Sequence, residues 1–182
     1  MKQRASDDPL AVDVTATQTC PVSSAPKPSP PRFLNHDDLG TVVRLAPLVA
    51  IDFVIRNARD DVLLGLRNNE PARDWYFVPG GMVLKNERLA DAFSRLLKTE
   101  TNYTVRIDDA RLLGAFEHFY KNNRFGNSDY GTHYVVLGYE LKMPDAAGPK
   151  PDYQHSELRW WPLAELLASD RVHENTKTYF RR

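Results

Sequence analysis

The chain has 182 residues, of which 42% are hydrophobic and 26% are charged, and its formal net charge is zero. This composition is ordinary for one globular domain, and the length is enough to bury a core. The balanced charge excludes a strong overall attraction to nucleic acid, so anion binding must come from a local group of basic side chains. The single cysteine, Cys20, excludes an internal disulfide and favours a reducing compartment.

Residues 1–32 form an N-terminal extension rich in Pro, Ser, Thr, Ala and Asp. Such a segment cannot bury enough apolar area to offset the entropy lost on ordering, so we expect it to be disordered, ahead of one domain at 33–182. No apolar run approaches the roughly 18 residues that a membrane helix needs. The N-terminus also lacks the apolar centre of a signal peptide. We therefore expect a cytoplasmic protein that does not bind membranes.

Apolar periodicity and turn residues divide the rest of the chain into strands and helices. Runs of β-branched and apolar residues indicate buried strands, and apolar residues at helical spacing indicate amphipathic helices. Strands before, between and after helices favour an α+β fold in which a mixed sheet lies between helical layers, an α/β/α sandwich. The predicted elements, in chain order, are a helix over 36–44, strands over 48–55, 62–67 and 75–79, a helix over 87–99, strands over 110–122, 132–143 and 157–161, and helices over 163–169 and 174–180.

The residues with the clearest chemical pattern lie between Gly80 and Glu100. A Gly-Gly pair leaves a predicted strand, a polar loop follows, and the predicted helix opens at Glu87. Glycine lets the backbone approach a ligand closely, and a helix N-terminus favours anions. Gly81 is separated from Glu87 by five residues, and Glu87 from Arg95 by seven. Glu87 and Arg95 would share a helix face, on which they can pair.

This spacing resembles the box of the Nudix family, which implies a Nudix fold and a Mg²⁺-dependent hydrolase. In that family, carboxylates of the helix bind the metal, which holds a diphosphate. The full box has carboxylates at the positions that here hold Leu96, Thr99 and Glu100, so two of the three are absent. Because Mg²⁺ prefers hard oxygen ligands, we expect one metal ion, held by Glu100 and the Gly80 carbonyl, and not a site with several metals.

The absence of these two carboxylates is shared with one group of Nudix-fold enzymes, which the chain resembles more closely. GDP-mannose mannosyl hydrolases are Nudix-fold enzymes that lack the same two groups, and they break the sugar C–O bond instead of a P–O bond. The resemblance covers nearly all of residues 33–180. It is carried by the stretches TVVR at 41–44, WYFVPGG at 75–81, HFY at 118–120, THYVVLG at 132–138 and LLASDRVH at 166–173.

The closer resemblance also implies a loop that carries a metal ligand and a general base. Gln154 would be a neutral oxygen ligand of the metal, and His155 would be the base. An unperturbed histidine, with a pKa of about 6.5, suits proton abstraction near neutral pH. For a lone loop histidine, simple surface exposure is the alternative.

Five further residues have roles implied by the resemblance. Asp52, inside an apolar strand, would be a site carboxylate near the sugar and the base; the alternative is a buried structural ion pair. Arg67 and Arg95 would neutralise the diphosphate, which guanidinium groups suit, although Arg95 could serve only the pair with the box glutamate. His118 and Tyr134 would contact the sugar and diphosphate, with a core aromatic as the alternative for Tyr134.

The chain departs from the family directly after the Gly-Gly pair, where members carry an arginine and this chain has Met82. A cation near the diphosphate is therefore lost, and Lys85 and Arg88 are the nearest candidates to replace it.

The sequence thus predicts a hydrolase that converts GDP-mannose, or GDP-glucose, into GDP and free sugar. Water, deprotonated by His155, would attack the anomeric carbon with inversion, and one Mg²⁺ per site, with Mn²⁺ as an alternative ion, would hold the leaving GDP. The resemblance also implies a homodimer, and no nucleic acid partner is expected. Two alternatives stay open: an ordinary Nudix diphosphatase that cleaves the P–O–P bond of a nucleoside diphosphate derivative, and a non-catalytic Nudix-fold nucleotide-binding module.

Overall fold

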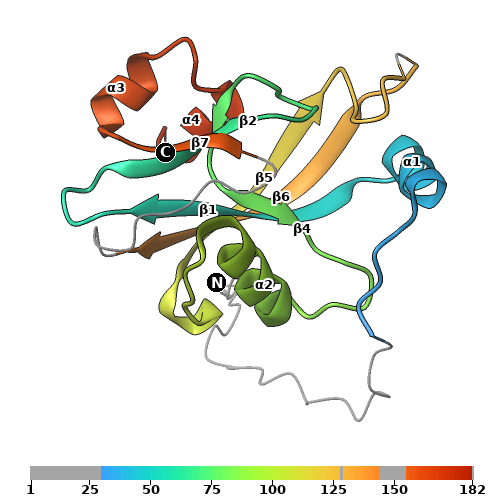
Figure 1. The fold of residues 1–182 in the computed structure, drawn as a ribbon, viewed down its shortest axis with the longest axis horizontal. Coiled ribbons are helices and arrows are strands. Elements are labelled where there is room, and N and C mark those ends of the chain that lie inside the picture. Colours follow the sequence, from blue (N-terminus) through green and yellow to red (C-terminus); the bar gives the residue numbers. More distant parts are fainter. Residues whose placement is uncertain (1–29, 128, 144–154, 182) are drawn as a thin grey trace, which may run out of the picture.

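The computed structural model describes residues 30–127, 129–143 and 155–181 (Figure 1). The predicted disordered extension falls almost wholly on residues outside this range, as does Gln154. The elements, in chain order, are α1 (His36–Leu45), β1 (Leu48–Arg56), β2 (Val62–Arg67), β3 (Tyr76–Phe77), β4 (Gly80–Met82), α2 (Leu89–Thr101), the 3-10 helix η1 (Ile107–Asp109), β5 (Arg111–Tyr120), β6 (Thr132–Lys142), β7 (His155–Trp161), α3 (Leu163–Ala168) and α4 (Glu174–Thr178).

The central strand of the sheet is β1. It pairs in parallel with β6 along its whole length and antiparallel with β4 over its first half, where Asp52 lies opposite Gly80. β5 pairs with β6 at one edge, and β2 joins β3 and β7 at the other. The expected hairpin of β1 and β2 forms only at its turn, at Arg56 and Val62. β4, and not β2, therefore borders the half of β1 that contains Asp52.

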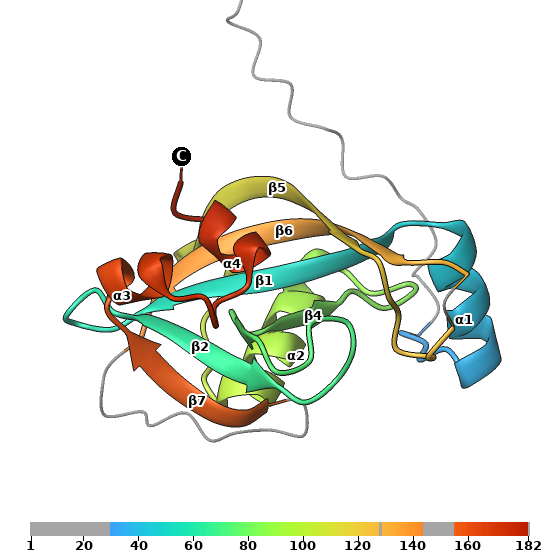
Figure 2. The same ribbon diagram turned by 90° about the horizontal axis from the view of Figure 1, so that it is seen from above.

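Helices cover both faces of this sheet. α2 lies against one face, and α3 and α4 lie over the other (Figures 1 and 2). Successive residues of a strand point to opposite faces, so Ile51, Phe53 and Ile55 pack with α2 while Val54 joins the core below α3 and α4. The predicted α/β/α sandwich with a mixed sheet is confirmed.

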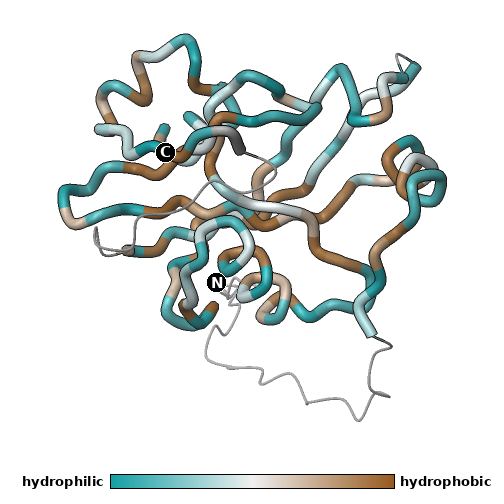
Figure 3. Tube along the Cα trace, viewed as in Figure 1, coloured by the Kyte–Doolittle hydropathy of each residue, from teal (hydrophilic) through white to brown (hydrophobic). Residues whose placement is uncertain are grey.

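The apolar residues of the chain follow this layering. Figure 3 shows hydrophobic segments along the central strands and hydrophilic segments over the turns that join them. Within the described ranges, no helix combines the length and the apolar character that crossing a membrane requires.

The structure corrects three predicted element boundaries, two in the box and one at the start of β7. α2 begins at Leu89 and not at Glu87, because Asn86 has a φ of 66° and the Glu87 carboxylate accepts the Leu84 N–H at 2.9 Å, which holds a non-helical turn. The Gly-Gly pair does not leave a strand but forms β4. β7 begins at His155, so this residue opens a strand and does not lie in a loop; its pairing with β2 decides this, and the sequence pattern did not show it.

Gly138 of β6 makes room on the sheet face that α4 covers. It lies in register between Asp52 of β1 and Gly114 of β5. A Cβ at this position would lie 2.9 Å from Cε2 of Phe116 and 3.1 Å from Cε1 of Tyr179. The two rings meet edge to face with their centroids 4.5 Å apart. The absent side chain thus allows the Tyr179 ring to lie directly on the sheet.

Substituting Gly138→Ala should lower the free energy of unfolding by about 1–3 kcal/mol, because both rings must move to admit the methyl group. Gly40→Ala is the matched control: it lies in α1, the nearest atoms to its new Cβ are 3.9 Å away, and alanine should stabilise the helix by up to about 1 kcal/mol. Urea denaturation measures both. Equal effects of the two substitutions would contradict the close packing at Gly138.

Candidate active site

A buried carboxylate, Asp52, lies at the centre of the candidate site. Only 7% of the residue is exposed, and its Oδ2 accepts a hydrogen bond from the Tyr179 hydroxyl at 2.7 Å. A Cβ on Gly80 would lie 2.4 Å from Asp52 Oδ1, so this close approach requires glycine. Within the described part of the chain, no cationic side chain lies within ion-pair distance of Asp52. The alternative of a structural ion pair is therefore not what the structure shows.

Burial raises the pKa of Asp52 to about 7. The hydrogen bond from Tyr179 and the charge of Arg67 lower this pKa, and the negative charge of Glu100 raises it. The charges of Arg67 on β2 and Glu100 on α2 thus both act on Asp52 of β1, so the three residues share one electrostatic environment. Carboxyl groups whose pKa is shifted towards neutral pH are common at functional sites.

Arg67, the last residue of β2, brings a cation to this environment. Its Nε is buried without a hydrogen-bond partner in the described structure, and its guanidinium lies 5.7 Å from the ring centroid of Phe77. Leaving a buried charged donor unsatisfied is costly. An anionic ligand would satisfy it, which is the chemistry expected for Arg67.

His118 and Tyr134 lie opposite each other on β5 and β6. Burial and, to a smaller extent, the neighbouring His173 together lower the pKa of His118 to about 4, so this imidazole is neutral at pH 7. Burial also raises the pKa of Tyr134, while the charges of Arg67 and Arg124 lower it. Both side chains can therefore act as neutral hydrogen-bonding groups.

Arg95 and Glu87 form the ion pair that the box spacing predicts. Arg95 Nε and Nη2 donate to the two Glu87 carboxylate oxygens at 2.6 and 2.7 Å, and Nη2 also donates to the Met82 carbonyl at 3.0 Å. Only 3% of the Glu87 side chain is exposed. Arg95 thus holds the loop between β4 and α2 in place, and its contact with a diphosphate stays a prediction.

The two box positions without carboxylates differ in environment. Leu96 is buried in the core, and a Cβ on Gly81 would lie 2.5 Å from its Cδ2, whereas Thr99 is exposed. Nowhere in residues 30–127, 129–143 and 155–181 do three or more His, Cys, Asp or Glu side chains gather as a metal site. The two metal donors predicted from this part, the Gly80 carbonyl and the Glu100 carboxylate, are oxygen ligands of the kind that a hard divalent cation prefers. Both belong to the surroundings of Asp52, since Gly80 adjoins this residue and the charge of Glu100 raises the pKa of Asp52.

The comparisons with known proteins agree with this geometry. Residues 46–182 match the family model of the NUDIX domain. The chain belongs to the Nudix family. It is 41% identical over 130 residues to the low-salt glycan biosynthesis protein Agl8 of Haloferax volcanii, which covers 71% of this chain and 80% of that protein.

Two solved structures illustrate the shared fold. The MutT protein from Methanosarcina mazei Go1 superposes with a TM-score of 0.61 at 20% identity, over 75% of this chain and 92% of that one. The NUDIX domain of Shewanella oneidensis NrtR, in complex with ADP ribose, superposes with a TM-score of 0.58 at 20% identity, over 81% and 96% of the two chains. The Nudix fold is thus confirmed, and family membership places the chain among hydrolases of nucleoside diphosphate derivatives.

The Nudix domain brings the backbone of the predicted base close to the site. β7 pairs with β2 so that His155 lies opposite Arg67, at a point where the register shifts. The start of β7 and the end of β2 therefore lie side by side. The predicted metal ligand Gln154 immediately precedes this strand, outside the described residues.

Two residues of the C-terminal segment that were not predicted as site residues, His173 and Tyr179, also reach the site. The Nδ1 of His173 accepts the Asn175 N–H at 3.1 Å, and its ring centroid lies 5.5 Å from that of Tyr120. Burial lowers the pKa of His173. The only sequence signal was the matching stretch 166–173, because no spacing rule connects Tyr179 to a residue 127 positions away.

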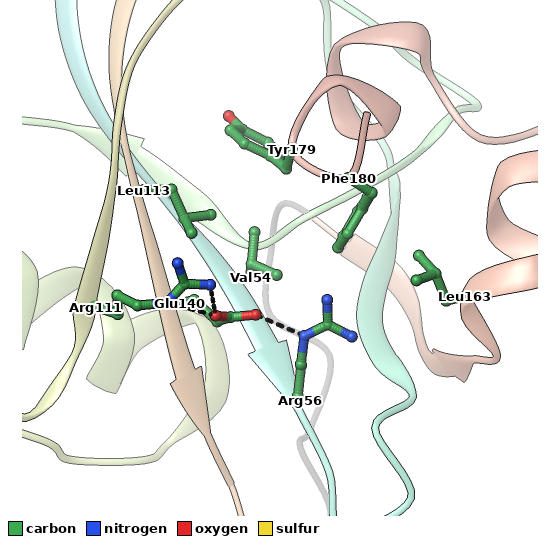
Figure 4. Close-up of a pocket in the computed structure, with 8 residues that line it drawn as sticks. All are labelled: Val54, Arg56, Arg111, Leu113, Glu140, Leu163, Tyr179 and Phe180. Atoms are coloured by element: carbon green, nitrogen blue, oxygen red, sulfur yellow. Dashed lines mark hydrogen bonds and ion pairs between the residues drawn. The ribbon is translucent and has the colours of Figure 1, made fainter. Parts of the chain in front are cut away.

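A cavity of about 340 Å³ lies beside Tyr179 but outside this site (Figure 4). Glu140 lies at its polar end, accepting a hydrogen bond from Arg56 Nε at 2.7 Å and others from Arg111. In Figure 4 the Tyr179 hydroxyl points away from this charged group. The cavity therefore faces the ring of Tyr179, while its hydroxyl belongs to the site around Asp52.

Proposed function

We propose that this Nudix protein is a cytoplasmic enzyme that hydrolyses GDP-mannose, or GDP-glucose, to GDP and free sugar by attack of water on the anomeric carbon with inversion. The observation that carries this proposal is the replacement of a box carboxylate by Leu96, which is buried in the core. Of the three late box positions, only Glu100 keeps a carboxylate. It is buried on α2, close enough to influence the pKa of Asp52.

The reduced donor set argues against attack at phosphorus. Carboxylate-rich sites use several metal ions to activate water and to hold both the attacking and the leaving oxygen. Gly80 and Glu100, with Gln154 as a proposed third ligand, would hold one ion, Mg²⁺ or in its place Mn²⁺. When bound, that ion would supply positive charge to the diphosphate that leaves as part of GDP.

The side chains of the domain divide the remaining tasks. Arg67, whose buried Nε has no described partner, binds the diphosphate and stabilises the charge that develops on it. Arg95 adds a second positive charge while it holds the loop. His118, Tyr134 and Asp52 bind the sugar, because neutral hydrogen-bonding groups and a carboxyl group suit hydroxyl ligands. Asp52 and the two arginines act in catalysis by fixing the anomeric carbon relative to water.

His155 is proposed as the general base that deprotonates the water. His118 is a poor base at neutral pH because its pKa is about 4, and the Nδ1 of His173 is already occupied by a backbone N–H. The backbone of His155 lies opposite Arg67, which brings it to the diphosphate end of the site. No general acid is required, because diphosphate is a good leaving group.

The glycan biosynthesis protein Agl8 supports a sugar-containing substrate. Its name places it in glycan assembly, and it shares 41% of aligned residues with this chain. The ADP ribose bound in the Shewanella oneidensis structure shows a nucleoside diphosphate derivative on the same fold. The guanine base and the identity of the sugar come from the sequence resemblance.

A homodimer is also proposed. Leu112 and Phe119 of the edge strand β5 are apolar and exposed, and Phe119 stacks on His133 with the ring centroids 4.3 Å apart. Apolar side chains on an edge strand form a surface that a second copy could cover.

Light scattering on the full chain should give twice the mass of one chain, and a single-chain mass would contradict the dimer.

Hydrolysis of GDP-mannose in ¹⁸O-labelled water should place the label in the released mannose, because water attacks carbon. Mass spectrometry of the products measures this directly. Label in a phosphate, with guanosine monophosphate and mannose 1-phosphate as products, would show an ordinary Nudix diphosphatase. Binding of the nucleotide without turnover would favour the non-catalytic module.

The variant His155→Gln should lower kcat for GDP-mannose by roughly 10²- to 10⁴-fold, the usual contribution of a general base, and should leave KM nearly unchanged. His36→Gln is the matched control, since His36 is exposed on α1. Steady-state kinetics with product identification measures both variants. Equal kcat values for the wild type and His155→Gln would contradict the assignment of His155 as the general base.

A further inference from the structure

We infer that Tyr179 is a positioning residue that fixes Asp52 and His118 relative to each other from the C-terminal segment. The inference rests on the proposed function, since it assigns a partner to two residues of that site. Tyr179 is 6% exposed and has not been assigned any role by the box or by the resemblance.

The hydroxyl of Tyr179 lies between the two site residues. Its oxygen is 2.7 Å from Asp52 Oδ2 and 3.3 Å from His118 Nε2. A phenol has one O–H donor and can also accept. When Asp52 is ionised, the O–H donates to its carboxylate, so the His118 Nε2 must carry a hydrogen and donate to the phenolic oxygen. With Asp52 ionised, the arrangement therefore selects the Nε2–H tautomer of His118 and one orientation of the Asp52 carboxylate.

The strands cannot make this connection themselves. Asp52 lies on β1 and His118 on β5, and β6 separates the two strands. The ring of Tyr179 crosses β6 at Gly138, where a Cβ would lie only 3.1 Å from its Cε1. Phe116 packs edge to face against the same ring. The ring is therefore held over β6, with its hydroxyl within reach of both Asp52 and His118.

The backbone of the C-terminal segment is fixed to the strand that precedes the Gly-Gly pair. The Tyr76 N–H donates to the Arg171 carbonyl at 3.0 Å, and the His173 N–H donates to the Tyr76 carbonyl at 3.1 Å. Val172 and Thr176 are fully buried. Since this anchoring determines where Tyr179 lies, the hydroxyl provides a fixed reference point for Asp52 and His118.

A positioning residue of this kind should affect turnover more than binding. Tyr179→Phe removes the hydroxyl and keeps the ring that packs on Gly138 and Phe116. We expect kcat to fall roughly 10- to 100-fold, the scale of small misplacements in an active site, with KM changed less than about twofold. Tyr139→Phe is the matched control: this buried tyrosine packs in the core on the opposite, α2 side of the sheet, and its kcat should equal that of the wild type.

A double-mutant cycle shows whether Tyr179 acts through Asp52. In an Asp52→Asn background, Tyr179→Phe should cause little further loss of kcat, because the partner that it positions has already been changed. Full additivity of the two losses, or an equal loss in Tyr139→Phe, would overturn the inference. The cycle uses GDP-mannose, or whichever sugar nucleotide the wild-type enzyme converts.

A ligand-free measurement separates this inference from the proposed function. Long-range ¹H–¹⁵N NMR of the free protein at about pH 8.5, where Asp52 is ionised, should show His118 as the Nε2–H tautomer in the wild type. The Nε2 shift of His118 should change in Tyr179→Phe but not in Tyr139→Phe. An unchanged His118 signal in Tyr179→Phe would overturn the inference whatever the substrate is. A changed signal in a protein that does not hydrolyse GDP-mannose would support the positioning role and reject only the proposed substrate.

Discussion

The hydrogen bond from Tyr179 to Asp52 connects the last helix of the chain to its central strand. It forms because two glycines leave room around it. Gly80 allows β4 to approach the Asp52 carboxylate, and Gly138 allows the tyrosine ring to lie on β6. The carboxyl group is buried by this packing, which raises its pKa to about 7. The packing contacts that bury Asp52 in the core therefore also set the pKa of this site carboxyl group.

Two residues of the box have a structural role in this chain. Its glutamate and arginine, Glu87 and Arg95, form a partly buried ion pair, and Arg95 also donates to the Met82 carbonyl. These contacts hold the loop between β4 and α2. Leu96, at a position where the full box has a carboxylate, is part of the hydrophobic core. Glu100 and the Gly80 carbonyl stay as the donors that we propose for a metal ion from the described part of the box.

Much of the fold could be predicted because apolar periodicity reports burial directly. The strand over 48–55 and the helix over 36–44 agree with β1 and α1 to within one residue. Asn35 caps α1, and its side chain accepts the Asp38 N–H at 2.8 Å. The boundaries near the box were less predictable, since they depend on partners far away in sequence. β4 exists only because β1 is beside it, and β7 extends back to His155 only because β2 pairs with it.

By itself, the sequence determined the family and the layers of the fold and supplied the predicted donors of the site, because these depend on residue type and local spacing. Asp52, Arg67 and Glu100 could be selected in this way, and the structure brings them into one electrostatic environment. Only the tertiary structure decided how they are held. The contact between Tyr179 and Asp52 joins residues 127 positions apart, and no periodicity in the chain encodes it. Such a contact follows from packing over Gly138, which is a property of the assembled sheet and not of any segment.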